Sequence, residues 1–509
     1  MIRYTSQHQL TLDLFKHPFE EELDPQNRWV KLASIVPWDS LAGIYSYKLN
    51  TDSGRLSVDA RHVIAALIVK HMLGLDDRGT IEMVKENIYL QYFCGLRSFT
   101  TKKLFDPSLF VDIRNRLGGN EFEDFNRLVI EKSEQLKPHQ ARVKKDVSKA
   151  KNNDNDKEED TPKNKGTLKV DATVADQEVT YPNDLKLLNT SRENLERICD
   201  ILVDNLPGEV KPRLYRRKAR SSYLNIAKKK RKSRKEINRG IKQQLQYIKR
   251  DLKAIANLSS KYKYVTPLEK RDVKLLGVIK QVYEQQKTMY ETKTRSCQHR
   301  IINIFQPHVR PMVRGKDKNK TEFGAKINVS EVDGFCRIDK LSWEAYNEGG
   351  NLKQQVENFR HVYGRYPKLL LADQIYLNRD NRKYLKDKGI EVVGKALGRP
   401  PKEENVSAAH KYRKKKKAAK RNTVEGKFGQ GKRGYGLNNI KARLPETSES
   451  WINSIFFVMN LMKLLSLLNS GKDIFVSIFK SLEKLIMEKY SHILSKIFAY
   501  NQIKIHLAA

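Results

Sequence analysis

The sequence is poor in cysteine, and the few cysteines it has are not paired by spacing. Cys94, Cys199, Cys297 and Cys336 are the only four, and none forms a CxxC pair. Neither a disulfide framework nor a zinc ligand set is therefore indicated. Although Cys297 lies close to His299, the two further clustered ligands that zinc needs are missing. This cysteine usage fits a reducing, cytoplasmic environment.

Long apolar runs are also lacking. The N-terminal stretch MIRYTSQHQLTLDLF has no continuous apolar segment, so we expect no signal peptide. The most apolar window, 451–468, contains Asn453, Asn460 and Lys463 within a length that barely spans a bilayer. We predict a buried helix there and no membrane partner. No GxxxxGK[ST] sequence occurs, and we expect no nucleotide cofactor.

Acidic residues are scarce relative to basic ones. Lysine and arginine together number 98 against 60 aspartate and glutamate, which gives a formal net charge of +38. A positive charge this large attracts polyanions, and it predicts a nucleic-acid partner. The 509 residues also exceed what one hydrophobic core usually supports, so we expect two or three domains.

The N-terminal part of the chain has a helical pattern. From residue 57 to residue 96 apolar residues recur at helical spacing, which predicts two or three short helices. The segment Leu73-Gly74-Leu75-Asp76-Asp77 reads as a turn between them. This pattern suits a helix-turn-helix reader of DNA and equally an ordinary helical bundle. We predict a helical DNA-binding region over 1–139 and a flexible charged linker over 140–166.

Short β-prone runs and helices alternate over 167–207 and 307–468. Asp171 lies inside the run 168–174, and Asp373 directly follows the run 368–372, which has the pattern of a buried strand. A carboxylate within a strand opposes local propensity, and such conflicts often mark functional sites. The segments 323–329 and 335–341 predict a hairpin, because the Asp333-Gly334 pair between them favours a tight turn.

Between the two halves of this region lies a basic helical insertion, 208–306. Its cluster KKKRK at 228–232 predicts contact with a phosphate backbone, although a solvated helical hairpin would have a similar pattern. The last segment, 469–509, alternates apolar and charged residues at helical spacing. This C-terminal helical segment could close the core or mediate self-association.

The stretch RNTVEGKFGQGKRGYGLNN, 421–439, would place a base, an acid and a base on one helical face. Arg421 and Glu425 are four residues apart, and Lys432 follows seven residues later. An exposed Arg–Glu pair worth ~0.2–0.5 kcal/mol would have the same spacing. Gly426, Gly429 and Gly431 would each cost this helix roughly 0.8–1.0 kcal/mol relative to alanine. The helix therefore depends on its surroundings.

Together these features resemble the DDE transposases of bacterial insertion sequences, over about residues 58–461. The family signature Y-(2)-R-(3)-E-(6)-K falls on Arg421, Glu425 and Lys432, while Ala418 stands in the place of the tyrosine. Other matching segments are VDA, YPNDL, VRGK, EFGAK, LSWEAYN, LAD and GRP. The resemblance implies an α+β multidomain protein. It would have an N-terminal helix-turn-helix-like domain and an RNase-H-like α/β catalytic domain, interrupted by the basic helical insertion.

By this resemblance, Asp171, Asp373 and Glu425 are the catalytic residues and the metal ligands. They would hold two Mg²⁺ ions, with Mn²⁺ able to substitute. Two hard cations can activate a water molecule and stabilise the leaving oxygen of a phosphodiester. The implied reaction is DNA cleavage at terminal inverted repeats, followed by joining of the 3′-hydroxyl ends to target DNA.

The resemblance also implies double-stranded DNA as partner and a homodimer, since two ends must be joined. The candidate DNA-binding residues are Lys395, Arg399, Arg421, Lys432 and Arg433. Ala418 removes one expected DNA contact and leaves the acids untouched. The basic insertion lies between the first two acids, so hairpin excision is not implied. Two alternatives stay open: an RNase-H-like nuclease without strand transfer, and a catalytically inactive DNA-binding relative.

Overall fold

The structure is a computed structural model that describes residues 22–49, 56–148, 164–263, 265–313, 321–393 and 419–469. The chain divides into two compact units. The first consists of Met1–Pro162, Asp333–Cys336 and Phe456–Ala509, and the second of Lys163–Val332 and Arg337–Ile455.

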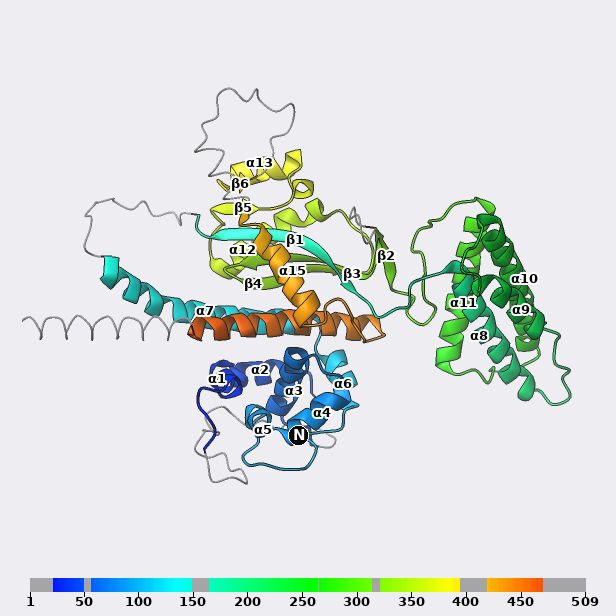
Figure 1. Ribbon diagram of the computed structural model, residues 1–509, viewed down its shortest axis with the longest axis horizontal. Helices are drawn as coiled ribbons and strands as arrows, with labels where there is room; N and C mark the ends of the chain where they lie inside the picture. The colour runs from blue at the N-terminus through cyan, green and yellow to red at the C-terminus, as the bar shows by residue number, and fades with distance from the viewer. Residues whose placement is uncertain are drawn as a thin grey trace, which may run out of the picture. The chain divides into compact units, whose positions relative to one another are not determined.

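Helices make up the described N-terminal part of the first unit (Figure 1). They are α1 (Arg28–Ile35), α2 (Trp38–Ser46), α3 (Ala60–Leu73), α4 (Asp77–Glu86), α5 (Ile88–Phe93), α6 (Leu109–Arg116) and α7 (Gly119–Ser148). The turn predicted between helices is confirmed. Gly74 ends α3 in the left-handed region, and Asp76 begins α4 by accepting a hydrogen bond from the Gly79 amide at 2.6 Å. Helix α7 continues to Ser148, beyond residue 140, where we expected a linker.

A buried ion cluster ties α3, α4 and α6 together. Arg114 donates two hydrogen bonds of 2.9 Å to Asp77, and the ammonium of the buried Lys70 lies 2.8 Å from the same carboxylate. Burial alone would raise the pKa of Asp77, but the two cations hold it below its ordinary value. Asp77 therefore stays ionised inside the helical unit.

The helix Pro445–Asn469 is long and apolar enough to cross a membrane. However, 72% of its most apolar window is buried inside the structure. Its Asn460 accepts a hydrogen bond from the Cys336 amide at 2.8 Å and donates one to the Cys336 carbonyl at 2.7 Å. A core helix of a soluble protein has the same properties. We predicted a buried helix for this segment. The length and composition of the helix are therefore weak evidence for a membrane span.

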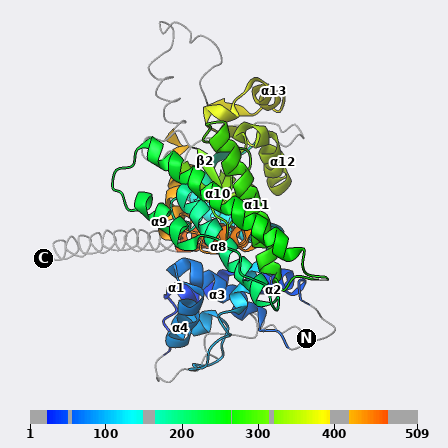
Figure 2. The ribbon, with the colours of Figure 1, turned by 90° about the vertical axis from the view of Figure 1, so that its right-hand side faces the viewer.

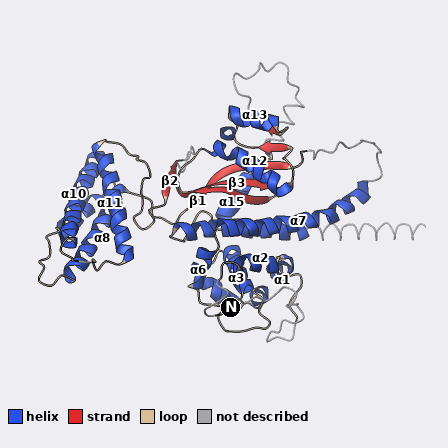
Figure 3. Cartoon of the chain, turned by 180° about the vertical axis from the view of Figure 1, so that it is seen from behind, coloured by secondary structure: helices blue, strands red, loops and turns tan. Residues whose placement is uncertain are grey.

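The described strands of the chain join one mixed sheet (Figure 3). They are β1 (Thr167–Asp176), β2 (Arg310–Val313), β3 (Thr321–Val332), β4 (Phe335–Ser342), β5 (Leu369–Leu371) and β6 (Glu391–Val393). The order is β2-β3-β1-β5-β6, with β4 also paired to β3. β1 is antiparallel to β3 and parallel to β5, and β5 is parallel to β6. The expected α+β class and the β3–β4 hairpin are both confirmed.

Side chains of β1 alternate between two different environments, as strand geometry requires. Leu168 and Val170 are buried in a core with Val356 of α12 (Leu352–Tyr363) and Leu385 of α13 (Arg379–Asp387). Residues 169 and 171 point to the other face, which α15 (Asn422–Gly434) covers (Figure 1). This alternation explains how an aspartate is tolerated in the middle of β1.

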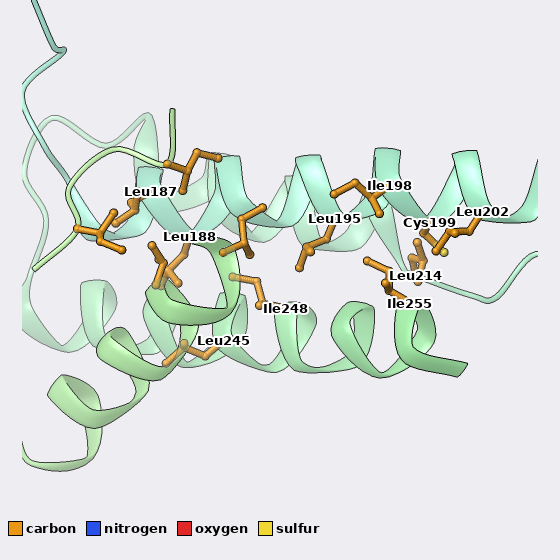
Figure 4. Packing of buried hydrophobic residues seen from close by; sticks show 14 of the residues in the cluster. Leu187, Leu188, Leu195, Ile198, Cys199, Leu202, Leu214, Leu245, Ile248 and Ile255 are labelled. Carbon is orange, nitrogen blue, oxygen red and sulfur yellow. The ribbon is translucent and has the colours of Figure 1, made fainter. Parts of the chain in front are cut away.

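The insertion forms a helical bundle with its own core. Its helices are α8 (Asp184–Asp204), α9 (Arg216–Ala227), α10 (Arg234–Ser259) and α11 (Lys270–Glu291), of which α8, α10 and α11 pack against one another (Figure 2). Leu195 and Ile198 of α8 meet Ile248 of α10 between the helices (Figure 4). Helix α8 thus belongs to this bundle, although it precedes residue 208, where we expected the insertion to begin.

Candidate active site

Asp171 and Asp373 are neighbours because β1 and β5 run parallel. Lys169 is paired with Leu371, and the two aspartates each lie two residues further along their strands. The side chain of Asp171 is 16% exposed, whereas that of Asp373 is 59% exposed. Asp373 also caps a short 3-10 helix, η4 (Gln374–Tyr376), by accepting a hydrogen bond from the Gln374 amide at 2.8 Å. Strand register alone brings two of the three predicted acids together.

Helix α15 supplies the third acid. Glu425 lies in its first turn, and the guanidinium of Arg421 lies 3.1 Å from the Glu425 carboxylate. The same guanidinium is 3.9 Å from Asp171 and 3.8 Å from Asp373. All three acids and Arg421 are thus gathered at one place on the sheet.

The surroundings of Asp171 make its carboxyl group harder to ionise than that of an exposed aspartate. Burial, helped by the nearby carboxylates of Glu348 and Glu425, raises the pKa of Asp171 to about 6. The Ala172 amide and Arg421 act in the opposite direction without cancelling the rise. Three carboxylates share one guanidinium, so the cluster is short of positive charge.

The donor set suits a hard divalent cation, since Mg²⁺ and Mn²⁺ prefer carboxylate oxygens. In the ranges that the structure describes, no three Asp, Glu, His or Cys side chains are already close enough to hold a metal ion. Asp171, Asp373 and Glu425 each contact the Arg421 guanidinium instead.

The start of α15 is fixed to the sheet by a hydrogen bond that the sequence pattern did not reveal. The Thr423 hydroxyl donates to Glu331 of β3 at 2.9 Å, and the Lys169 ammonium lies 2.7 Å from the same carboxylate. Glu331 is only 1% exposed. One signal could have identified Lys169: like Asp171, it is a charged residue within the β-prone run 168–174. Glu331 lies beyond the β-prone run 323–329 and gave no such signal.

The end of α15 is fixed by Lys432. Its ammonium donates hydrogen bonds to Asp176 at 3.2 Å and to Glu322 at 3.1 Å, and its side chain is 20% exposed. Asp176 ends β1 and Glu322 lies near the start of β3. Lys432 therefore already has two carboxylate partners within the protein.

The remaining predicted DNA-binding residues divide into two groups. Arg433 is exposed near the end of α15, where its guanidinium donates a hydrogen bond to the Gly429 carbonyl at 3.4 Å. Lys395 and Arg399 lie outside the described residues, as does Ala418. The structure gives no account of these last three positions.

Two known families match opposite parts of the chain. Residues 370–462, which include Asp373 and Glu425, match the family described as a transposase DDE domain. Residues 17–116 match a transposase domain of the DUF772 family. These matches support a transposase. More particularly, the two domains together support an insertion-sequence DDE transposase, the family that the sequence resembles. Asp171 lies outside both matched segments.

A relative from Rhizobium meliloti, "Uncharacterized protein ORF8 in nfe locus", is 25% identical to this chain over 189 residues. The similarity covers 36% of this chain and 79% of that protein. No solved structure matches the chain.

Proposed function

We propose that this protein cleaves DNA at the terminal inverted repeats of its own insertion sequence and joins the 3′-hydroxyl ends to target DNA. One observation carries the proposal: Asp171, Asp373 and Glu425 converge on Arg421, in a chain that matches two transposase families. The reaction class is metal-dependent phosphodiester cleavage followed by transesterification.

The strand arrangement supports an RNase-H-like catalytic domain. β1 is central, the antiparallel β3 lies on one side of it, and the parallel strands β5 and β6 lie on the other. This arrangement sets the first acid on β1 beside the second acid after β5. A helix that packs on the same face then adds the third.

Each residue of the cluster has a separate task in the proposed reaction. Asp171, Asp373 and Glu425 would hold two Mg²⁺ ions, which supply a Lewis acid and lower the pKa of an attacking water. Arg421 offsets the mutual repulsion of the three carboxylates and keeps them together. Thr423 hydrogen-bonds the sheet from the first turn of α15 and so helps to fix the position of Glu425.

DNA contacts are proposed for cations near this cluster. Arg433 is exposed and can reach a phosphate without breaking an ion pair. Lys395 and Arg399 are proposed on the resemblance alone. Lys432 would reach DNA only by leaving Asp176 and Glu322. The N-terminal helices would read the inverted repeats, and a homodimer would hold the two ends.

The substitution Glu425→Gln tests the proposal, because it removes one carboxylate charge and keeps the side-chain shape. We expect loss of Mg²⁺-dependent cleavage of a duplex that carries the element's end, with DNA affinity within a few fold of wild type. The matched control is Glu284→Gln on the exposed surface of α11, which should cleave normally. Full activity of Glu425→Gln would overturn the assignment.

A strand-transfer assay separates the transposase from a plain nuclease. The substrate is a duplex already cut to expose the 3′-hydroxyl of the element's end. The transposase should produce a joined product with target DNA and Mg²⁺. A nuclease would cut the target and give no joined product.

A further inference from the structure

Helix α10 carries a row of cations along one side. Successive members are separated by intervals of four, three, seven and four residues, so they fall on one helical face. The row consists of Lys235, Arg239, Lys242, Lys249 and Lys253. All five are exposed, whereas Ile248 and Ile255 on the opposite side are buried in the bundle core.

The row has no counter-charge of its own. Among the described residues, none of the five cations has a carboxylate partner, while Arg216 and Lys261 in the same bundle are paired with Asp200 and Glu209. Between residues 211 and 253 only Glu236 and Asp251 are acidic. Glu236 is held by Lys229, and Asp251 is fully buried. The positive charge of this face is therefore available to an external anion.

Two arginines beside the row are held in place by an aromatic ring. The guanidinium groups of Arg213 and Arg250 lie 4.9 Å and 4.6 Å from the centre of the Tyr215 ring. Since the ring is already engaged by both cations, it is a poor platform for stacking an unpaired base. Both arginines are exposed and can donate to phosphate oxygens. This arrangement favours backbone recognition over binding of single-stranded bases.

The length of the row suits a double helix. Lys235 and Lys253 are eighteen residues apart on α10, which corresponds to ~27 Å along the axis. Duplex DNA carries a negative charge about every 1.7 Å of its own axis. A straight helix can thus present several cations at once to the phosphates beside one groove.

We propose that the α10 row is a docking surface for the backbone of duplex DNA, formed by none of the residues of the acid cluster. The inference rests on the proposed function for the identity of the polyanion. The lysines of the α10 row are suited to sequence-independent contacts, because an ammonium makes compact point contacts with phosphate. The row would hold DNA that the catalytic cluster acts upon.

The test compares two triple variants of the full-length protein with equal loss of charge. One is Lys242→Gln, Lys249→Gln and Lys253→Gln in the row. The other is Lys270→Gln, Lys274→Gln and Lys280→Gln on exposed positions of α11. Binding to a duplex of about 30 base pairs is measured by fluorescence anisotropy across salt concentrations. The row variant should bind roughly tenfold or more weakly, with a salt slope shallower by about 2.7, and the α11 variant should change little.

Three results would overturn the docking surface. The first is an equal loss of affinity in both triple variants, which would reflect net charge alone. The second is no loss of affinity in the row variant. The third is tighter binding of wild type to a single strand of the same length than to the duplex. Circular dichroism of both variants checks that the bundle is folded.

Cleavage distinguishes this inference from the proposed function. At saturating protein the row variant should still cut the element's end with Mg²⁺, because its acid cluster is intact. If the wild-type protein cuts no DNA, the catalytic proposal is refuted. If the row variant nevertheless binds the duplex more weakly than wild type, the docking surface is supported.

Discussion

Arg421 is the residue on which the acid cluster depends. Its guanidinium contacts carboxylates from β1, from the end of β5 and from α15, which are far apart in the sequence. The i, i+4 spacing of Arg421 and Glu425 would also occur in an ordinary surface ion pair. The contacts with Asp171 and Asp373 set it apart from such a pair, because they join residues brought together only by the fold.

At the residue scale, we predict that Asp171 shapes the pH dependence of cleavage. Burial raises its pKa to about 6, so the carboxyl group is protonated below that pH and ionised above it. A metal ligand must be deprotonated, and protons therefore compete with the ion. At limiting Mg²⁺, the single-turnover cleavage rate should rise between about pH 5 and pH 7.

Raising the Mg²⁺ concentration should move this inflection to lower pH, because the ion competes more strongly with the proton. Substituting Mn²⁺ provides a second check with a different ion. A rate that does not change with pH over this interval at limiting Mg²⁺ would contradict the assigned role of Asp171.

At the scale of elements, the two fixed ends of α15 decide where Glu425 lies. Thr423 binds Glu331 near the start of the helix, and Lys432 binds Asp176 and Glu322 near its end. The glycines within α15 lower its intrinsic helix stability. Contacts at both ends offset this weakness, so the helix is held by the sheet rather than by propensity.

We predict that Lys432→Met lowers the rate of cleavage at saturating DNA by roughly ten- to a hundredfold, since small misplacements of a catalytic group are costly. The salt dependence of DNA binding should stay unchanged, because the ammonium is already paired with carboxylates. The neighbouring Arg433→Gln serves as the control, and it should make the salt slope shallower by about 0.9.

The opposite pattern would identify Lys432 as a phosphate contact. In that case Lys432→Met would make the salt slope shallower by about 0.9 and leave cleavage at saturating DNA unchanged. The resemblance to the transposase family implies that role, and the two measurements together separate it from the positioning role.

Local patterns in the sequence predicted several of these elements. The Asp333-Gly334 pair predicted the β3–β4 hairpin, and both residues have the positive φ that such a turn requires. The spacing of Arg421 and Glu425 predicted α15. These features depend on residues within a few positions of one another, so the sequence alone could reveal them.

The remaining features depend on contacts between distant segments. The adjacency of Asp171 and Asp373 follows from the β1–β5 register, and no local pattern shows which strands pair. The partners of Lys432 lie 256 and 110 residues away. Gly324 belongs to this group too, because a Cβ there would lie 1.9 Å from the Ala175 carbonyl of the neighbouring strand. The sequence motif EFGAK contains this glycine without showing the reason for it.

At the scale of the whole molecule, the excess positive charge and the proposed catalytic acids lie in different parts of the chain. Residues 208–300 contain 28 lysines and arginines against seven acidic residues, so less than a fifth of the chain supplies more than half of the net charge. The proposed catalytic acids lie on the sheet and on α15. Salt dependence of DNA binding should therefore be governed by the insertion, and metal dependence by the sheet.

The insertion core also contains a carboxylate whose ionisation opposes folding. Asp251 of α10 is fully buried, and neither of its oxygens has a hydrogen-bond partner among the described residues. Burial, together with the nearby Glu196, raises the pKa of Asp251 to about 8. In the unfolded chain an aspartate ionises near pH ~3.9. The folded state therefore retains a proton that the unfolded state releases, and stability falls as pH rises from about 4 to about 8.

We predict that Asp251→Asn removes this part of the pH dependence. The variant should gain thermal stability relative to wild type as pH rises from about 5 to about 8, because asparagine has no proton to release. Since a chain with several cores can unfold in more than one step, calorimetry should show the gain in a single transition. Asp204→Asn, at an exposed position of α8, is the matched control and should follow wild type. A constant difference between Asp251→Asn and wild type across this pH range would show that Asp251 has the same pKa in the folded and unfolded chain.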